Sequence, residues 1–68
     1  MIDFDFVRVS GAAGWEVMAG DSEALRVLRT IAPLVGGTMA GELMTLPADA
    51  DVDAIGGILE EAGYKTRI

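Results

Sequence analysis

The stretch that decides the fold is residues 2–9, which read IDFDFVRV. Phe4 and Phe6 alternate here with Asp3 and Asp5. An apolar–polar period of two is typical of a β-strand with one buried face. We therefore expect a strand that turns its aromatic side chains inward and its carboxylates outward.

The outward face of this strand changes character along its length. After the two aspartates, the same face carries Val7 and Val9. An apolar half on an outward face indicates either a bulge or a second contact surface. This face is therefore the first candidate for partner binding.

A second strand follows a glycine-bracketed turn at residues 10–14, which read SGAAG. Beyond the turn, Trp15 and Val17 alternate with Glu16 and Met18, so the two strands should pair as a hairpin. Backbone N–H groups in such a turn can hold an anion. The turn lacks a P-loop lysine and opens no helix, so a plain hairpin turn is the better interpretation.

Two helical segments and two further extended segments complete the chain. The first helix begins at Asp21 or Ser22 and either ends near Ala32 or kinks at Pro33. Residues 38–46 are expected to form one strand, which Pro47 ends. The second helix covers about residues 50–62, with an apolar stripe that includes Ile55 and Ile58, and a last strand covers 64–68.

The predicted order is β-β-α-β-α-β in a single small domain, residues 1–68. This order is typical of an α/β (α+β) two-layer sandwich: a mixed four-stranded sheet with two helices on one face. The opposite face of the sheet should then be bare. We expect that bare face to carry the side chains of Asp3, Asp5, Val7, Val9, Glu16, Met18, Lys65 and Arg67.

Composition removes most routes to catalysis. The chain has no histidine and no cysteine, and eleven acidic residues stand against five basic ones. The common general base, the thiol nucleophile and the soft-metal ligands are thus missing. We expect no enzyme, no cofactor and no bound metal.

One acidic pattern has the spacing of a calcium loop. Asp49, Asp51, Asp53 and Glu60 stand at positions 1, 3, 5 and 12 of an EF-hand. Position six is Ala54, where the loop needs glycine for its sharp turn. We therefore interpret Asp49 and Asp51 as helix caps and Asp53 as a complement to the helix dipole.

The formal charge of −6 constrains the partners. Nucleic acid and anionic membranes require a basic footprint, so we expect neither as a direct partner. A protein with a basic surface fits better. The chain is 51% hydrophobic, high for so small a domain, and a homodimer would cover the surplus. The acidic start, Met1 to Asp5, lacks a basic signal-peptide region, which indicates a cytoplasmic location.

Trp15 has two interpretations. It anchors a small core, which its alternation with Val17 favours, or it is a binding hot spot on the open face. Counting it, the predicted partner-binding residues are Asp3, Asp5, Val7, Val9, Trp15, Glu16 and Met18.

The function that fits these features is a non-enzymatic protein-interaction module that binds a protein partner, itself, or both. Its acidic and partly apolar surface would suit an inhibitor of nucleic-acid-processing machinery, of the kind that phages and mobile elements encode. The alternative is a small dimeric regulatory or ligand-sensing domain of ferredoxin-like type, an analogy that rests on fold alone.

Overall fold

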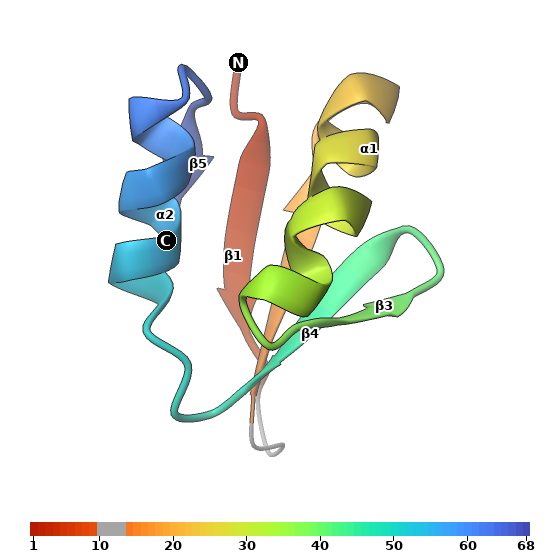
Figure 1. The fold of residues 1–68 in the computed structure, drawn as a ribbon, viewed down its shortest axis with the longest axis vertical. Coiled ribbons are helices and arrows are strands. Elements are labelled where there is room, and N and C mark those ends of the chain that lie inside the picture. The colour runs from red at the N-terminus through yellow and green to blue at the C-terminus, as the bar shows by residue number, and fades with distance from the viewer. Residues whose placement is uncertain (10–13) are drawn as a thin grey trace.

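The fold is a five-stranded mixed sheet with two helices, seen in a computed structural model that describes residues 1–9 and 14–68 (Figure 1). Along the sheet the strands lie in the order β3-β4-β2-β1-β5. The strand β5 pairs with β1 in parallel, and all other neighbours pair antiparallel. The elements are β1 (Phe4–Arg8), β2 (Gly14–Ala19), α1 (Ser22–Ile31), η1 (Ala32–Leu34), β3 (Thr38–Ala40), β4 (Leu43–Pro47), α2 (Val52–Glu61) and β5 (Thr66–Arg67).

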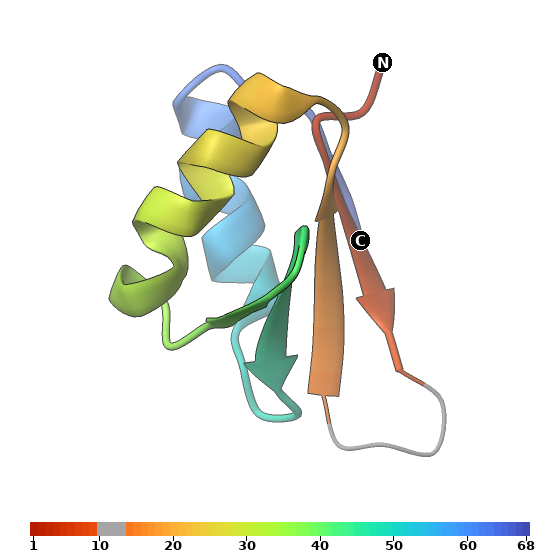
Figure 2. The same ribbon diagram turned by 90° about the vertical axis from the view of Figure 1, so that its right-hand side faces the viewer.

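Both helices cover the same face of the sheet, and the other face is bare (Figure 2). The predicted two-layer α/β class is therefore confirmed. The core fills the space between the layers and is entirely apolar among the described residues. Its members are Phe4, Phe6, Val17, Ala24, Leu28, Ala32, Met44, Leu46, Val52, Ile55 and Leu59.

Period-two alternation places these core residues in cross-strand rows. Phe6 lies opposite Val17, and Val17 lies opposite Met44 on the next strand. Phe4 packs edge-on against Tyr64, with 5.4 Å between the ring centroids. Because each pair contributes a contact on the same face, one uninterrupted apolar layer runs across the sheet.

The number of strands is five rather than four, because residues 38–46 form a hairpin instead of one strand. The chain reverses between β3 and β4 at Gly41, whose φ of 64° lies in the left-handed region that favours glycine. Met39 then pairs with Met44 across the short turn. The extra reversal makes β4 antiparallel to both β2 and β3. The strand β3, which α1 links to β2, therefore runs parallel to β2, with β4 inserted between them.

Aspartates cap both helices, as expected in part. The carboxylate of Asp21 accepts the backbone N–H of Ala24 at 2.8 Å, and that of Asp51 accepts the N–H of Ala54 at 3.1 Å. Pro33 lies in the 3-10 turn η1, directly after α1 ends at Ile31. The carboxylates at the two caps thus have structural roles at helix starts.

Candidate protein-binding surface

The bare side of the sheet, which we call the open face, brings together four of the predicted partner-binding residues. In the β1–β2 register, Asp5 lies opposite Met18 and Val7 lies opposite Glu16. These four side chains therefore form a compact block at the centre of the face. Their strands lie in the middle of the sheet, where no helix covers this side (Figure 2).

Two cross-strand rows extend this block to the edges of the sheet. The first row runs from Arg67 on β5 through Asp5 and Met18 to Leu43 and Ala40. The second row runs from Val7 and Glu16 to Thr45 and Thr38, an ordering fixed by the same registers. The centre of the open face thus alternates apolar and acidic side chains, and its margin carries a basic residue, two threonines and two apolar residues. Leu43 and Thr45 were missed from the sequence, because residues 38–46 read as one strand with no defined register.

The apolar side chains at the centre of the open face are accessible. Val7 is 38% exposed and Met18 is 40% exposed. A hollow of about 230 Å³ adjoins Met18 and is also lined by Ile2, Asp5 and Arg67. An exposed thioether beside a hollow can repack around an incoming side chain, because methionine is flexible and polarisable.

An ion pair makes the open face less negatively charged than the sequence predicts. The guanidinium of Arg67 donates to the carboxylate of Asp5, with 2.8 Å between Nη2 and Oδ2. This hydrogen bond holds the pKa of the Asp5 carboxyl below its ordinary value; desolvation opposes the shift, and the charge of Arg67 adds to it. It raises the pKa of Arg67 in turn. Of the two carboxylates in the block, only that of Glu16 lies outside this pair.

Asp3 and Val9 flank this block at the ends of β1. The carboxylate of Asp3 accepts the backbone N–H of Lys65 at 2.9 Å, which helps hold the start of β5 against β1. Val9 is half-buried, and its N–H donates to the carbonyl of Gly14. Both residues therefore have structural roles at the strand ends.

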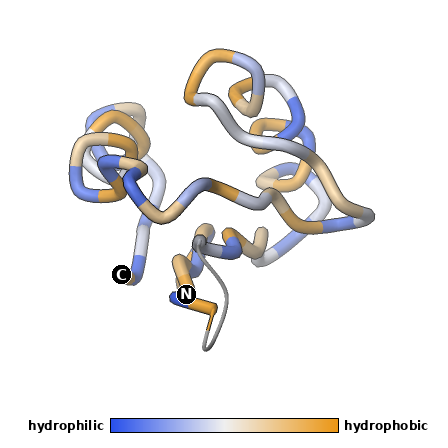
Figure 3. The backbone as a smooth tube through the Cα atoms, turned by 90° about the horizontal axis from the view of Figure 1, so that it is seen from below, coloured by the Kyte–Doolittle hydropathy of each residue, from blue (hydrophilic) through white to orange (hydrophobic). Residues whose placement is uncertain are grey.

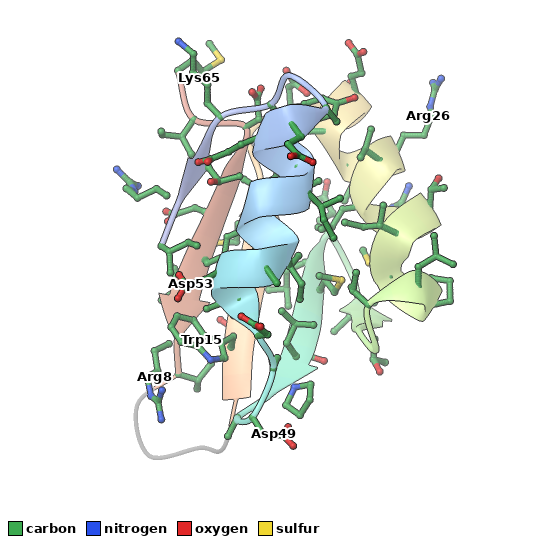
Figure 4. All side chains as sticks on the ribbon, turned by 60° about the vertical axis from the view of Figure 1, so that its left-hand side comes forward. Arg8, Trp15, Arg26, Asp49, Asp53 and Lys65 are labelled. Atoms are coloured by element: carbon green, nitrogen blue, oxygen red, sulfur yellow. The ribbon has the colours of Figure 1, made fainter. Side chains whose placement is uncertain are left out.

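Trp15 lies on the other side of the sheet from this block. It pairs with Leu46 and alternates with Val17, both of which are buried under the helices. The guanidinium of Arg8 lies over its ring, 5.5 Å from the centroid (Figure 4). Trp15 is half-buried and packs against the core, so the structure favours the anchor over the open-face hot spot.

A second apolar surface lies between the helices. A hollow of about 210 Å³ there is lined only by apolar side chains, namely those of Ile31, Leu34, Val35, Ile55, Ile58 and Leu59. We call it the inter-helix groove. Leu34 is 79% exposed and Ile58 is 62% exposed. The expectation from the apolar stripe that Ile58 points inward is wrong, because α2 turns this side chain toward the groove, whereas Val52, Ile55 and Leu59 point into the core.

The acidic residues around α2 do not form a metal centre. No group of carboxylates suited to a metal ion occurs within residues 1–9 and 14–68. Asp51 is engaged as the cap of α2, and the carboxylate of Glu60 accepts the hydroxyl of Thr66 at 2.7 Å. Among the described residues the cap of α2 is Asp51, and the expected second cap at Asp49 does not form. The turn at residues 10–13, weighed above as an anion site, lies outside the described residues.

No family model matches this chain, and no curated protein or solved structure matches it. Within the described part of the chain, neither helix has the length and apolar character needed to cross a membrane.

Proposed function

We propose that this chain is a non-enzymatic protein-interaction module that binds a protein partner through the open face. The observation that carries the proposal is the central block of that face. It presents two accessible apolar side chains, Val7 and Met18, between charged neighbours, and Met18 adjoins a hollow. Interfaces between separately folded proteins mix apolar and polar side chains in this way.

Charge supports a basic partner. The chain carries −6 overall, and Glu16 adds a carboxylate to the block outside the Asp5–Arg67 pair. A partner with Lys or Arg around an apolar patch would complement this face. Its attraction to the negative charge would speed association, and added salt would slow association by screening that charge. Proteins that act on nucleic acids have basic surfaces, so the proposed partner includes nucleic-acid-processing proteins that this chain would inhibit.

Pairing of two copies through the same face is the competing form of this function. It would bury the same apolar side chains. A small domain is stabilised by such burial, because its own core buries a limited share of its surface. It would also bring two chains of charge −6 together. For this reason we place a basic partner before a second copy.

The test is affinity capture from the native host, followed by measurement with the purified partner. The variant Val7→Thr/Met18→Thr removes the two apolar side chains of the central block and keeps strand propensity. Thr30→Ser on the exposed side of α1 is the control. We expect the double variant to weaken binding about tenfold or more, since losing central interface side chains costs over ~1 kcal/mol each. The control should bind like the wild type, and raised salt should weaken both.

Equal affinity of the double variant and the wild type would contradict the proposal. A wild-type dimer at tens of micromolar that the double variant abolishes would replace the basic partner by a second copy.

A further inference from the structure

The hollow beside Met18 lies at one end of the open face, next to the first and last strands of the chain. It measures about 230 Å³, and its lining residues are Ile2, Asp5, Met18, Ala19, Gly20 and Arg67. Figure 3 shows both ends of the chain on the sheet side of the molecule, away from the helices. The hollow is larger than the ~150 Å³ of a cavity that holds benzene. It therefore has room for one ring-sized side chain of a partner.

The guanidinium of Arg67 is held in a fixed orientation at this hollow. Its Nε and Nη2 donate to the two carboxylate oxygens of Asp5, at 3.3 and 2.8 Å. Because such paired hydrogen bonds lie in the plane of the guanidinium, they leave the faces of the group unoccupied. The side chain of Arg67 is 66% exposed, so a partner can reach it. Arg67 thus offers a flat, pre-oriented cationic surface.

Met18 and Arg67 both favour an aromatic ring as the occupant of the hollow. Met18 is 40% exposed and lies opposite Asp5 in the β1–β2 register, so its thioether is close to the ion pair. A thioether makes favourable contacts with aromatic rings. A guanidinium attracts the electron-rich face of a ring. An aliphatic side chain would gain neither contact, so the lining discriminates by chemistry as well as by size.

The ion pair disfavours a charged group as the occupant. An anion that approaches Arg67 would meet the carboxylate of Asp5 beside it, in a chain with a formal charge of −6. A cation that approaches Asp5 would have to displace Arg67 from its two hydrogen bonds. An uncharged ring leaves the pair intact and still interacts with the positive charge, through its quadrupole.

We propose that this hollow binds an aromatic side chain of the protein partner, packed between the thioether of Met18 and a face of the Arg67 guanidinium. The inference rests on the proposed function, because the hollow belongs to the open face. It adds the side chain by which the partner is anchored. Aromatic anchors that fill a pocket are typical hot spots of protein interfaces.

Two small probes test the anchor on the full chain without any partner. Phenol carries the ring of a tyrosine side chain, and cyclohexanol is its saturated analogue. NMR follows their binding through the ε-methyl group of Met18 and the Nε–H of Arg67. The variant Arg67→Lys keeps the positive charge and removes the flat guanidinium. Arg29→Lys, at an exposed position of α1, is the matched control.

We expect phenol to shift both signals saturably, with the ε-methyl group of Met18 moving upfield under the ring, and cyclohexanol to bind more weakly. Arg67→Lys should weaken phenol binding about two- to fivefold, the equivalent of the ~0.5–1 kcal/mol of an exposed cation–π contact. Arg29→Lys should bind phenol like the wild type.

No phenol binding, equal binding of the two probes, or equal affinity of Arg67→Lys and the wild type would overturn the proposal. Larger shifts with acetate or guanidinium would do the same, because an ion would then be the preferred occupant. A partner that binds the open face without moving the Met18 ε-methyl signal upfield would overturn the aromatic anchor and leave the proposed function intact.

Discussion

The two faces of strand β1 differ in how much of the fold depends on them. Phe4 and Phe6 lie under the helices, while Asp5 and Val7, their immediate neighbours, lie on the open face. The inward side chains hold the layers together. The outward side chains can be exchanged with little effect on folding, so they are free to serve recognition. Substitution of an inward residue should therefore mainly lower stability, and substitution of the adjacent outward residue should mainly weaken binding.

The largest effect should come from Phe6→Ala compared with Val7→Ala. Phe6 is buried, and deleting a buried ring costs about 3–5 kcal/mol. A domain of this size holds only ~0.1 kcal/mol per residue, so we expect Phe6→Ala to lose about half of the free energy of unfolding. Val7→Ala should cost under about 1 kcal/mol. Urea unfolding followed by circular dichroism measures both, and comparable losses would break the separation of the faces.

The helix layer allows the same comparison between Ile55 and Ile58. Ile55 is 7% exposed and Ile58 is 62% exposed. We expect Ile55→Ala to lower the free energy of unfolding by about 2–4 kcal/mol and Ile58→Ala to change it by less than ~0.5 kcal/mol. Thermal unfolding of the two variants measures both changes. A large loss at Ile58 would mean that α2 is rotated so that this residue belongs to the core.

A smaller effect, of opposite sign, is expected at Gly57 in α2. A methyl group added there meets nothing within 4 Å, whereas one added at Gly56 lies 3.0 Å from Cδ1 of Ile68. Gly57→Ala should therefore raise the free energy of unfolding by about 1 kcal/mol. Gly56→Ala should raise the free energy of unfolding by less, because the side chain of Ile68 must move to make room for the methyl group. Denaturant midpoints of the two variants test this, and a loss of stability in Gly57→Ala would count against an open site.

The smallest effect should be the pH dependence of the Asp5–Arg67 pair on the open face. The pairing lowers the pKa of Asp5 in the folded state, so its contribution to stability is present above the unfolded pKa, near pH ~4. It is lost as the pH falls through the lower folded value. Asp5→Asn should flatten this part of the acid limb in pH-dependent unfolding. Glu23→Gln, from the first turn of α1, is the control, and an identical acid limb in Asp5→Asn and wild type would exclude the pair as a contributor.

Much of this fold could be predicted from local sequence patterns. The alternation in residues 2–9 and 15–19 predicts both central strands, and their register then assigns the faces. The two aspartate caps follow from the residues that precede each helical stripe. These features depend on neighbours along the chain, which a sequence displays directly.

The features that escaped prediction depend on contacts between distant segments. In the sequence Gly41 reads equally as a bulge or a break in one strand, and only the pairing of Met39 with Met44 reveals the hairpin. Ile58 fits the apolar stripe of α2, but the separation of the helices leaves it at the rim of the groove. The Asp5–Arg67 pair joins residues 62 positions apart, and the parallel pairing of β1 with β5 brings them together.

The most direct test of the proposed function is methyl NMR of the full chain titrated with its purified partner. We expect the signals of Val7 and Met18 to shift first and most, while those of the buried Val17 and Leu28 change little. Shifts centred on the Asp49–Asp53 segment, with the open-face signals unchanged, would contradict it.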